Sequence, residues 1–274
     1  MASVLLGLAV SSAIALAAAG VTRSVTATSG ATSATVTYLA NSNSAAGPPF
    51  ADVRLKITRQ GSTAFDAAVR APLCRSSCWP DSYPGHRFLA VSDIEGNGSP
   101  DVILDLYSGG AHCCSIVQVY RYDSERGRYA IFQRDFWDPG ARLERLHGIY
   151  EFLSADYRFA YEFTSFAFSG LPLAIWHFGA HGFVNVTRRF PALIALDAAR
   201  QYRAFLANRK QGFGLGFIAA WAADEDLLGH GALVASTLAT QNREGDLRSA
   251  DSPVHGSTFI VALKYFLARH GYVR

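Results

Sequence analysis

Lysine is almost absent from this 274-residue sequence: of its 25 lysines and arginines, only Lys56, Lys210 and Lys264 are lysine. Charged residues make up 17% of the chain, against about 25% in typical soluble domains, and the net charge is only +3. No run of five like charges occurs, so nothing indicates a nucleic-acid-binding arm or an acidic tail. The preference for arginine, together with abundant alanine, is typical of a GC-rich bacterial genome.

The common catalytic motifs are missing as well. The sequence has no Gly-x-Ser-x-Gly elbow, no His-Glu-x-x-His pair and no Walker loop. Gly212-x-Gly214-x-Gly216 follows a helical pattern instead of a strand, which excludes a dinucleotide-binding loop. The acidic triplet Asp224–Asp226 is interpreted as an exposed patch on a helix. These absences favour a non-catalytic protein, and a hydrophobic content of 50% is enough for a packed core.

An apolar, alanine-rich run extends from Val4 to Gly20. Ala17 and Ala19 have the small side chains that a secretory peptidase requires before its cleavage point. We therefore predict that residues 1–20 are a signal peptide and that the protein is secreted or extracytoplasmic, at the cell surface. The alternative is an uncleaved N-terminal segment that acts as a membrane tether, because a run of about 17 residues is near the lower limit for crossing a bilayer.

The four cysteines are Cys74, Cys78, Cys113 and Cys114. An even number in an exported protein predicts disulfide bonds, and four cysteines allow three pairings. We expect the first two to be linked to the last two, which would close loops of about 40 residues and contribute about 3–4 kcal/mol. A vicinal Cys113–Cys114 bond would require a strained peptide and would point to redox chemistry. Zinc binding at Cys113 beside His112 is a further alternative.

Residues 31–190 have the pattern of antiparallel β-structure. Apolar and polar residues alternate in Val53–Thr58, as in a half-buried strand, and an N-terminal hairpin is expected there. Two later segments, 87–136 and 151–190, each contain four strand-like stretches separated by turns; Phe166–Gly170 is one of those in the second segment. The sequence therefore predicts an internal repeat of two four-stranded units.

The hydrophobic period changes to that of helices at Pro191, which suits the first turn of a helix. Further helices are expected over Leu215–Leu228, Leu233–Gln241 and Thr258–His270. Residues 191–274 are therefore predicted to form a helical subdomain packed against the sheets, and the predicted fold class is α+β.

The stretch between residues 93 and 101 has the clearest chemical meaning. Side-chain oxygens stand at positions 1, 3, 5 and 9 of this loop, Gly98 stands at position 6, and Ser99 at position 7 offers a backbone carbonyl. The four side chains are those of Asp93, Glu95, Asn97 and Asp101. Calcium loops have this ligand spacing, and three crowded carboxylates repel one another without a cation. We predict a structural Ca²⁺ site, with a polar β-turn at Asn97-Gly98 as the alternative.

At these residues the chain resembles the FG-GAP/VCBS repeat family, whose loops include the integrin-alpha-like calcium loop. A strand enters an Asp-rich loop, and the next strand begins with Asp101-Val102-Ile103. The resemblance implies propeller-blade-like four-stranded repeats, calcium bound by the loop, and a role in adhesion or ligand recognition. The second repeat lacks the loop, because Tyr157-Arg158-Phe159 follows Asp156. Two repeats therefore imply an open stack of sheets instead of a closed propeller.

Gly109 and Gly110, close to His112, form a second candidate ligand site. Two glycines would let a ligand or a metal ion approach the histidine. Alternatively, they form a turn that delivers the neighbouring cysteines to their disulfide partners. His177 and His181 flank a predicted hairpin turn and are interpreted as a solvated tip, with a metal-binding pair as the alternative.

Three functional hypotheses follow. The leading one is a secreted, non-catalytic binding or structural protein that is stabilised by Ca²⁺ and disulfides and binds an extracellular protein or a glycan, but no nucleic acid. The second is a secreted hydrolase with a cleft between the β region and the helices, where His112, Asp105 or His177 would act as acid or base. The third is a thiol redox protein that uses Cys113 and Cys114.

Overall fold

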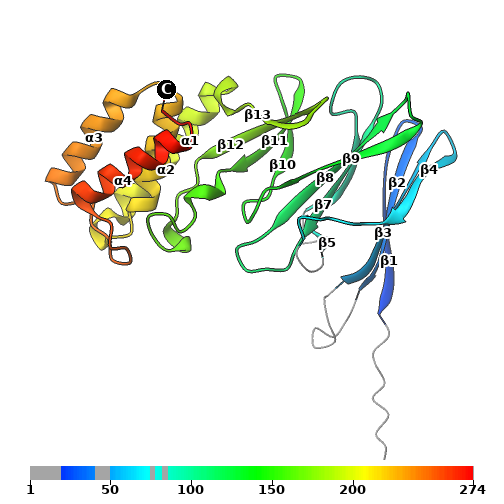
Figure 1. The fold of residues 1–274 in the computed structure, drawn as a ribbon, viewed down its shortest axis with the longest axis horizontal. Helices are drawn as coiled ribbons and strands as arrows, with labels where there is room; N and C mark the ends of the chain where they lie inside the picture. The colour runs from blue at the N-terminus through cyan, green and yellow to red at the C-terminus, as the bar shows by residue number, and fades with distance from the viewer. Residues whose placement is uncertain (1–19, 41–49, 75–77, 82–85, 274) are drawn as a thin grey trace, which may run out of the picture.

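The computed structural model describes residues 20–40, 50–74, 78–81 and 86–273 (Figure 1). Residues 1–19 of the predicted signal peptide lie outside the described part, so the signal peptide stays a prediction. Within the described ranges, no helix is both long and apolar enough to cross a membrane. Three antiparallel sheets and a group of helices make up this part of the chain, which confirms the predicted α+β class.

The first sheet is a four-stranded antiparallel meander in the order β1-β2-β3-β4. Its strands are β1 (Val21–Ser29), β2 (Thr32–Ala40), β3 (Phe50–Arg59) and β4 (Ser62–Ala68). Val53, Leu55 and Ile57 of β3 are buried, whereas Arg54 lies on the outer face and pairs with Asp66 of β4 at 2.6 Å. The predicted alternation is therefore confirmed. The expected hairpin is part of a larger sheet, whose first strand lies before the predicted start of the β region.

The second sheet corresponds to the predicted first repeat. It pairs β5 (Trp79–Pro80), β6 (Leu89–Ser92), β7 (Asp101–Tyr107), β8 (Ser115–Asp123) and β9 (Arg128–Asp135). The middle strand β8 is buried on both faces. On one face Ile116 belongs to the same hydrophobic cluster as Leu55 of the first sheet, and on the other Val119 belongs to the same cluster as Phe178 of the third. This sheet is therefore the middle layer of the β region (Figure 1).

The third sheet agrees with the predicted second repeat only in part. It consists of β10 (Arg142–Leu146), β11 (Ile149–Ala155), β12 (Leu173–Gly179) and β13 (Gly182–Asn185), in that order. The strand predicted at Phe166–Gly170 is wrong, because the chain forms the 3₁₀ turns η2 (Tyr157–Phe159) and η3 (Phe166–Phe168) there. Phe159 and Phe163 bury their rings among the helices instead of extending the sheet. The propeller-blade-like repeat is thus not confirmed.

The helices after residue 190 begin and end close to the predicted residues. After the short turn η4 (Thr187–Arg189) come α1 (Pro191–Asn208), η5 (Arg209–Gln211), α2 (Leu215–Leu227), α3 (Gly231–Arg243) and α4 (Gly256–Arg269). Helix α2 is the most deeply buried of these. A Cβ atom at Gly216 would lie 2.4 Å from the carbonyl oxygen of Phe168, so this glycine lets α2 pack directly against the η3 segment.

Asp224 corrects the predicted exposed acidic patch. Its side chain in α2 is completely buried, at 0% exposure. Burial raises the pKa of Asp224 to about 10, and the nearby carboxylate of Asp197 in α1 raises it further. Asp197 itself pairs with Arg200 at 2.5 Å and accepts the backbone N–H of Leu173 at 3.1 Å. With this raised pKa, the Asp224 carboxyl group is protonated and neutral at pH 7. The predicted exposure is wrong because α2 is the central helix and not a surface helix.

The raised pKa of Asp224 predicts a stability that depends on pH. Folding takes up a proton at this carboxyl group between its unfolded pKa, near 4, and its folded pKa of about 10. The free energy of unfolding should therefore fall as pH rises through this range, by up to about 1.4 kcal/mol per pH unit from this group. Asp224→Asn keeps the shape of the side chain and removes the group that titrates. The free energy of unfolding of this variant, relative to that of wild type, should therefore increase from pH 6 to pH 9.

Urea unfolding followed by circular dichroism at several pH values measures this effect. The matched control is Asp52→Asn, which changes an exposed aspartate in β3 and should show the wild-type pH dependence. Parallel pH curves for wild type and Asp224→Asn would contradict the assignment.

Candidate ligand-binding cleft and metal loop

A cleft of 720 Å³ lies where the second and third sheets meet the helical subdomain. The end of β9, the β11–η2 junction, β12 and the β13–η4 segment form its walls together with Leu227 of α2 and residues 270–272. This is the location that the hydrolase hypothesis predicted for a cleft. Among the described residues, four arginines and several aromatic side chains contribute to the lining.

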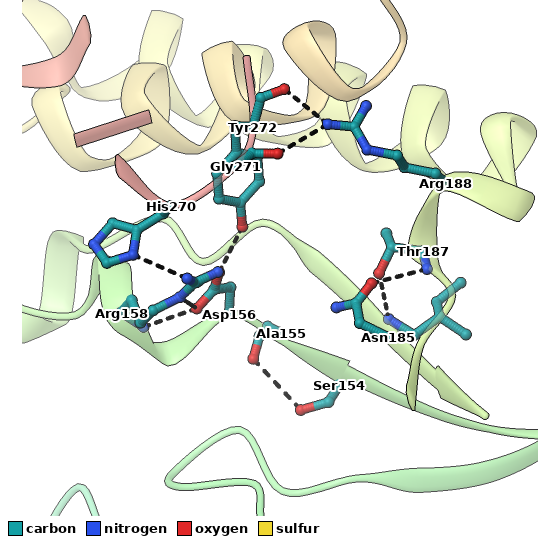
Figure 2. Close-up of polar contacts among 11 residues, drawn as sticks. Ser154, Ala155, Asp156, Arg158, Asn185, Thr187, Arg188, His270, Gly271 and Tyr272 are labelled. Carbon is teal, nitrogen blue, oxygen red and sulfur yellow. Dashed lines mark hydrogen bonds and ion pairs between the residues drawn. The ribbon is translucent and has the colours of Figure 1, made fainter. Parts of the chain in front are cut away.

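One wall of the cleft is a hydrogen-bonded chain of polar side chains (Figure 2). Arg158 Nε donates to Asp156 Oδ1 at 2.8 Å, the Tyr272 hydroxyl donates to Asp156 Oδ2 at 2.6 Å, and Arg158 Nη1 lies 2.9 Å from His270 Nδ1. Burial alone would raise the pKa of Asp156, but the hydrogen bonds from Arg158 and Tyr272 outweigh it and hold that pKa below its usual value. Asp156 is therefore a carboxylate that links the third sheet to the C-terminal residues.

Arg188 lies on the opposite side of the junction between the third sheet and the C-terminal residues. Its Nη1 donates to the Leu227 carbonyl at 3.1 Å. Its Nη2 donates to the carbonyls of Gly271 and Tyr272, both at 2.9 Å (Figure 2). The last carbonyl groups of a helix have no partner within that helix. Arg188 therefore supplies donors to carbonyl groups at the end of α2 and in the C-terminal segment.

Arg134, at the end of β9, has a different environment. Its guanidinium carbon lies 3.1 Å from the centre of the Trp176 ring, and its Nε is buried without a hydrogen-bond partner in the described part of the chain. Burial lowers the pKa of Arg134 to about 10. The carboxylate of the neighbouring Asp135 accepts the backbone N–H of Trp137 at 2.8 Å, and no ion pair among the described residues involves Arg134.

The predicted calcium loop is a compact turn between β6 and β7. Asp93 Oδ1 accepts the backbone N–H of Asn97 at 3.0 Å, and Oδ2 accepts that of Gly98 at 2.8 Å. Asn97 Oδ1 accepts the backbone N–H of Ser99 at 2.8 Å. Gly98 has a φ of +80°, which suits glycine at the sharp turn of position 6. The loop therefore closes around Asp93.

Asp101, at the start of β7, is 1% exposed, and neither of its carboxylate oxygens has a side-chain hydrogen-bond donor among the described residues; a hydrogen bond from the backbone of Ile94 lowers its pKa in part. Glu95 Oε2 and Ser99 Oγ are likewise buried without a partner. Burial and the nearby Glu95 carboxylate raise the pKa of Asp101 to about 7. Arg121 lies 3.6 Å from Glu95 Oε1 and offsets part of this negative charge. Within the described ranges, no three His, Cys, Asp or Glu side chains converge on one point that would hold a metal ion.

The disulfide pairing differs from the expected one. Cys74 pairs with Cys78, and Cys113 pairs with Cys114. The predicted links between the two pairs are therefore wrong, because each cysteine meets its partner within its own loop; the Cα atoms of Cys74 and Cys78 lie 5.8 Å apart.

The glycine segment before the vicinal disulfide is packed against protein atoms. A Cβ at Gly109 would lie 2.1 Å from the ring of Trp79, and the Gly110 carbonyl accepts the Tyr107 hydroxyl at 2.7 Å. His112 lies with its ring centre 3.7 Å from that of Phe166, and its carbonyl accepts the Tyr157 hydroxyl at 2.6 Å. These contacts favour the interpretation as a structural turn, which braces the η2–η3 segment.

The predicted acid/base residues do not meet in the cleft. Asp105 contacts His86 at 3.2 Å in the second sheet, and His177 contacts Glu151 at 3.1 Å in the third. Neither of them, nor His112, is among the residues that line the cleft. The cleft was thus predicted in the right place with the wrong residues.

Sequence reasoning missed the residues that do line it. Arg134, Asp156, Arg158 and Tyr272 come from three distant parts of the chain, and none belongs to a motif. The excess of arginine over lysine is the one signal in the sequence, and genome composition explains it equally well.

The contacts of Tyr272 predict a loss of stability in Tyr272→Phe. Removing its hydroxyl leaves the buried Asp156 with one fewer donor, which should lower the free energy of unfolding by about 1–2 kcal/mol at pH 7. Because the pKa of Asp156 is lowered on folding, its contribution is present at neutral pH and is lost as pH falls through the folded pKa. The difference from wild type should therefore shrink in acid.

Chemical denaturation at pH 7 and pH 3 tests this expectation. Tyr265→Phe changes a tyrosine of α4 that is 69% exposed and should leave stability unchanged. An equal loss in both variants would refute a specific role for the Tyr272–Asp156 bond.

No family model matches the sequence, and no solved structure matches it. A stretch of 162 residues is 26% identical to a probable thylakoid lumen protein from Synechocystis sp. (strain ATCC 27184 / PCC 6803 / Kazusa). The similarity covers 52% of this chain and 44% of that protein, so the chain spans less than half of the relative's length. A similarity of this extent assigns no family.

Proposed function

We propose that the chain is an extracytoplasmic, non-catalytic binding or structural protein whose second sheet is stabilised by calcium. The observation that carries the proposal is the buried Asp101 carboxylate, which has no side-chain hydrogen-bond donor among the described residues and lies near the carboxylates of Glu95 and Asp93; the backbone of Ile94 and the charge of Arg121 offset only part of the rise in its pKa. A buried carboxylate without a compensating partner costs several kcal/mol. A divalent cation would supply that compensation.

The extracytoplasmic location has two supports. The similar Synechocystis protein is described as a probable thylakoid lumen protein. All four cysteines of the chain are paired in disulfides, which persist in oxidising compartments and are rare in reducing ones. The predicted signal peptide agrees with this location. As part of the same proposal, the chain binds a protein or a glycan at the cell surface.

The residues of the 93–101 loop fit calcium chemically. Asp93, Glu95, Asn97 and Asp101 offer side-chain oxygens and Ser99 a carbonyl, and hard oxygen donors are the ligands that Ca²⁺ prefers. The bonds from the Asn97 and Gly98 amides to Asp93 already hold the turn. When bound, the ion would neutralise the crowded carboxylates and thereby stabilise the β6–β7 connection. This assignment follows the resemblance to FG-GAP/VCBS loops.

The proposal predicts that calcium raises thermal stability. Wild-type protein in Ca²⁺ at a hundredfold excess over Kd should unfold about 5–10 °C above the same protein in EDTA. Asp101→Asn keeps the side-chain shape but removes a ligand charge, so its Tm should respond little to either addition. Differential scanning calorimetry provides the measurement.

Asp138→Asn, which changes an exposed aspartate outside the loop, is the matched control and should respond to Ca²⁺ as wild type does. An identical wild-type Tm in EDTA and in Ca²⁺ would rule out the calcium site and with it the likeness to FG-GAP/VCBS loops.

The observed Cys113–Cys114 bond favours thiol redox chemistry as a second candidate function. In that reaction a dithiol reductant would transfer two electrons and two protons to the bond, giving two thiols and an oxidised reductant. Both cysteines are half-buried, so only part of their surface is accessible to a small thiol. We expect the double variant Cys113→Ser/Cys114→Ser to lose any insulin-reducing activity measured with dithiothreitol, whereas Cys74→Ser/Cys78→Ser should keep it. No activity above the uncatalysed rate in wild type would remove this candidate.

A further inference from the structure

The cleft between the third sheet and the helices carries more positive than negative charge. Arg134, Arg158, Arg188 and Arg189 line it, against the carboxylates of Asp135 and Asp156. Arg158 is paired with Asp156. Arg188 donates to carbonyl groups at the end of α2 and in the C-terminal segment, and Arg189 is exposed at the rim. The remaining arginine, Arg134, is therefore the one whose environment needs an explanation.

Arg134 is held in place without an ion pair among the described residues; the carboxylates of Asp135 and Asp156 act on its charge from beyond ion-pair distance. Trp176 covers one face of its guanidinium at 3.1 Å, and Phe136 lies 5.5 Å from it. Its buried Nε has no hydrogen-bond partner among the described residues. A buried Nε–H group without an acceptor, on a half-buried guanidinium, is destabilising for the free protein. Such a cost is expected where the missing acceptor comes from a ligand.

The surroundings of Arg134 are aromatic and pre-organised. Trp137, three residues further along, also lines the cleft and is 44% exposed. Its ring is stacked on that of Tyr157 at 5.1 Å with an interplanar angle of 4°. Tyr157 is fixed in turn by its hydroxyl bond to the His112 carbonyl. An exposed indole held in this way offers a flat apolar surface beside the positive charge.

We propose that this cleft binds a small organic anion. Its carboxylate or phosphate group would accept hydrogen bonds from Arg134, and its ring would lie against Trp137. A planar guanidinium matches both kinds of anionic group in bidentate geometry. A cavity of 720 Å³ has the size usual for a small-molecule site. The inference goes beyond the proposed function by naming a ligand class, and it does not depend on the calcium loop.

Isothermal titration with matched probes tests the inference. Benzoate and phenyl phosphate carry a ring and an anion, benzyl alcohol carries the ring alone, and inorganic phosphate carries the anion alone. We expect at least one of the two ring anions to bind wild type about tenfold more tightly than benzyl alcohol and inorganic phosphate. Which ring anion is preferred distinguishes a carboxylate from a phosphate ligand.

Two variants locate the interaction. Arg134→Met should reduce the affinity for the preferred anion at least about tenfold, while its Tm without ligand stays at or above that of wild type. Arg134→Lys keeps the charge without the bidentate fork and should give an intermediate affinity. Arg59→Met is the matched control, because it removes a guanidinium that is stacked on Tyr122 at 4.4 Å outside the cleft, and it should bind as wild type does.

The inference is overturned if benzoate, phenyl phosphate and benzyl alcohol bind with equal affinity, if Arg134→Met and Arg134→Lys both bind as wild type, or if no probe binds. These outcomes leave the response of Tm to calcium untouched, so failure here is distinguishable from failure of the proposed calcium-stabilised function. A Tm of Arg134→Met well below that of wild type, without a loss of affinity, would make Arg134 a structural residue.

Discussion

The burial of Phe159 and Phe163 among the helices is the contact on which the arrangement of the molecule depends. Both rings leave the third sheet and are at most 2% exposed; Phe159 packs on Phe266 and Phe163 on Phe259. Burying each such ring contributes about 1.5–3 kcal/mol. The chain between β11 and β12 cannot form another strand while it makes these contacts, so it runs from sheet to helices and back. The cleft is the space left beside that excursion.

The same excursion brings distant polar residues together. Asp156 directly precedes the segment, and Tyr272 reaches it from the C-terminal end of the chain, where its ring also packs against Phe159. Arg134 approaches from the neighbouring sheet. The charges in the cleft are therefore placed by apolar packing. Polar atoms of Asp101 in the loop and of Arg134 in the cleft are among the buried atoms that lack a side-chain partner in the described chain, and the two proposed ligands, Ca²⁺ and an organic anion, would each supply one.

Local patterns in the sequence predict the elements well and the site poorly. The alternation of Val53–Thr58 and the helical period after Pro191 depend on neighbouring residues, and both are confirmed. The strand predicted at Phe166–Gly170 is wrong because a contact with α2, distant in sequence, outweighs local preference. The predicted exposure of Asp224 is wrong for the same reason: nothing next to it in the sequence shows that α2 is central. The cleft residues share no spacing, so only the folded chain brings them together.

The proposed anion site requires that the cleft is already formed in the free protein and that Arg134 faces into it. A crystal structure of the protein with benzoate or phenyl phosphate tests this most directly. We predict that an anionic oxygen of the ligand lies within hydrogen-bond distance of the Arg134 guanidinium, with the ring against Trp137 and the Phe159–Phe266 contact unchanged. A ligand bound elsewhere, or an Arg134 side chain turned away from the cleft into solvent, would contradict the account.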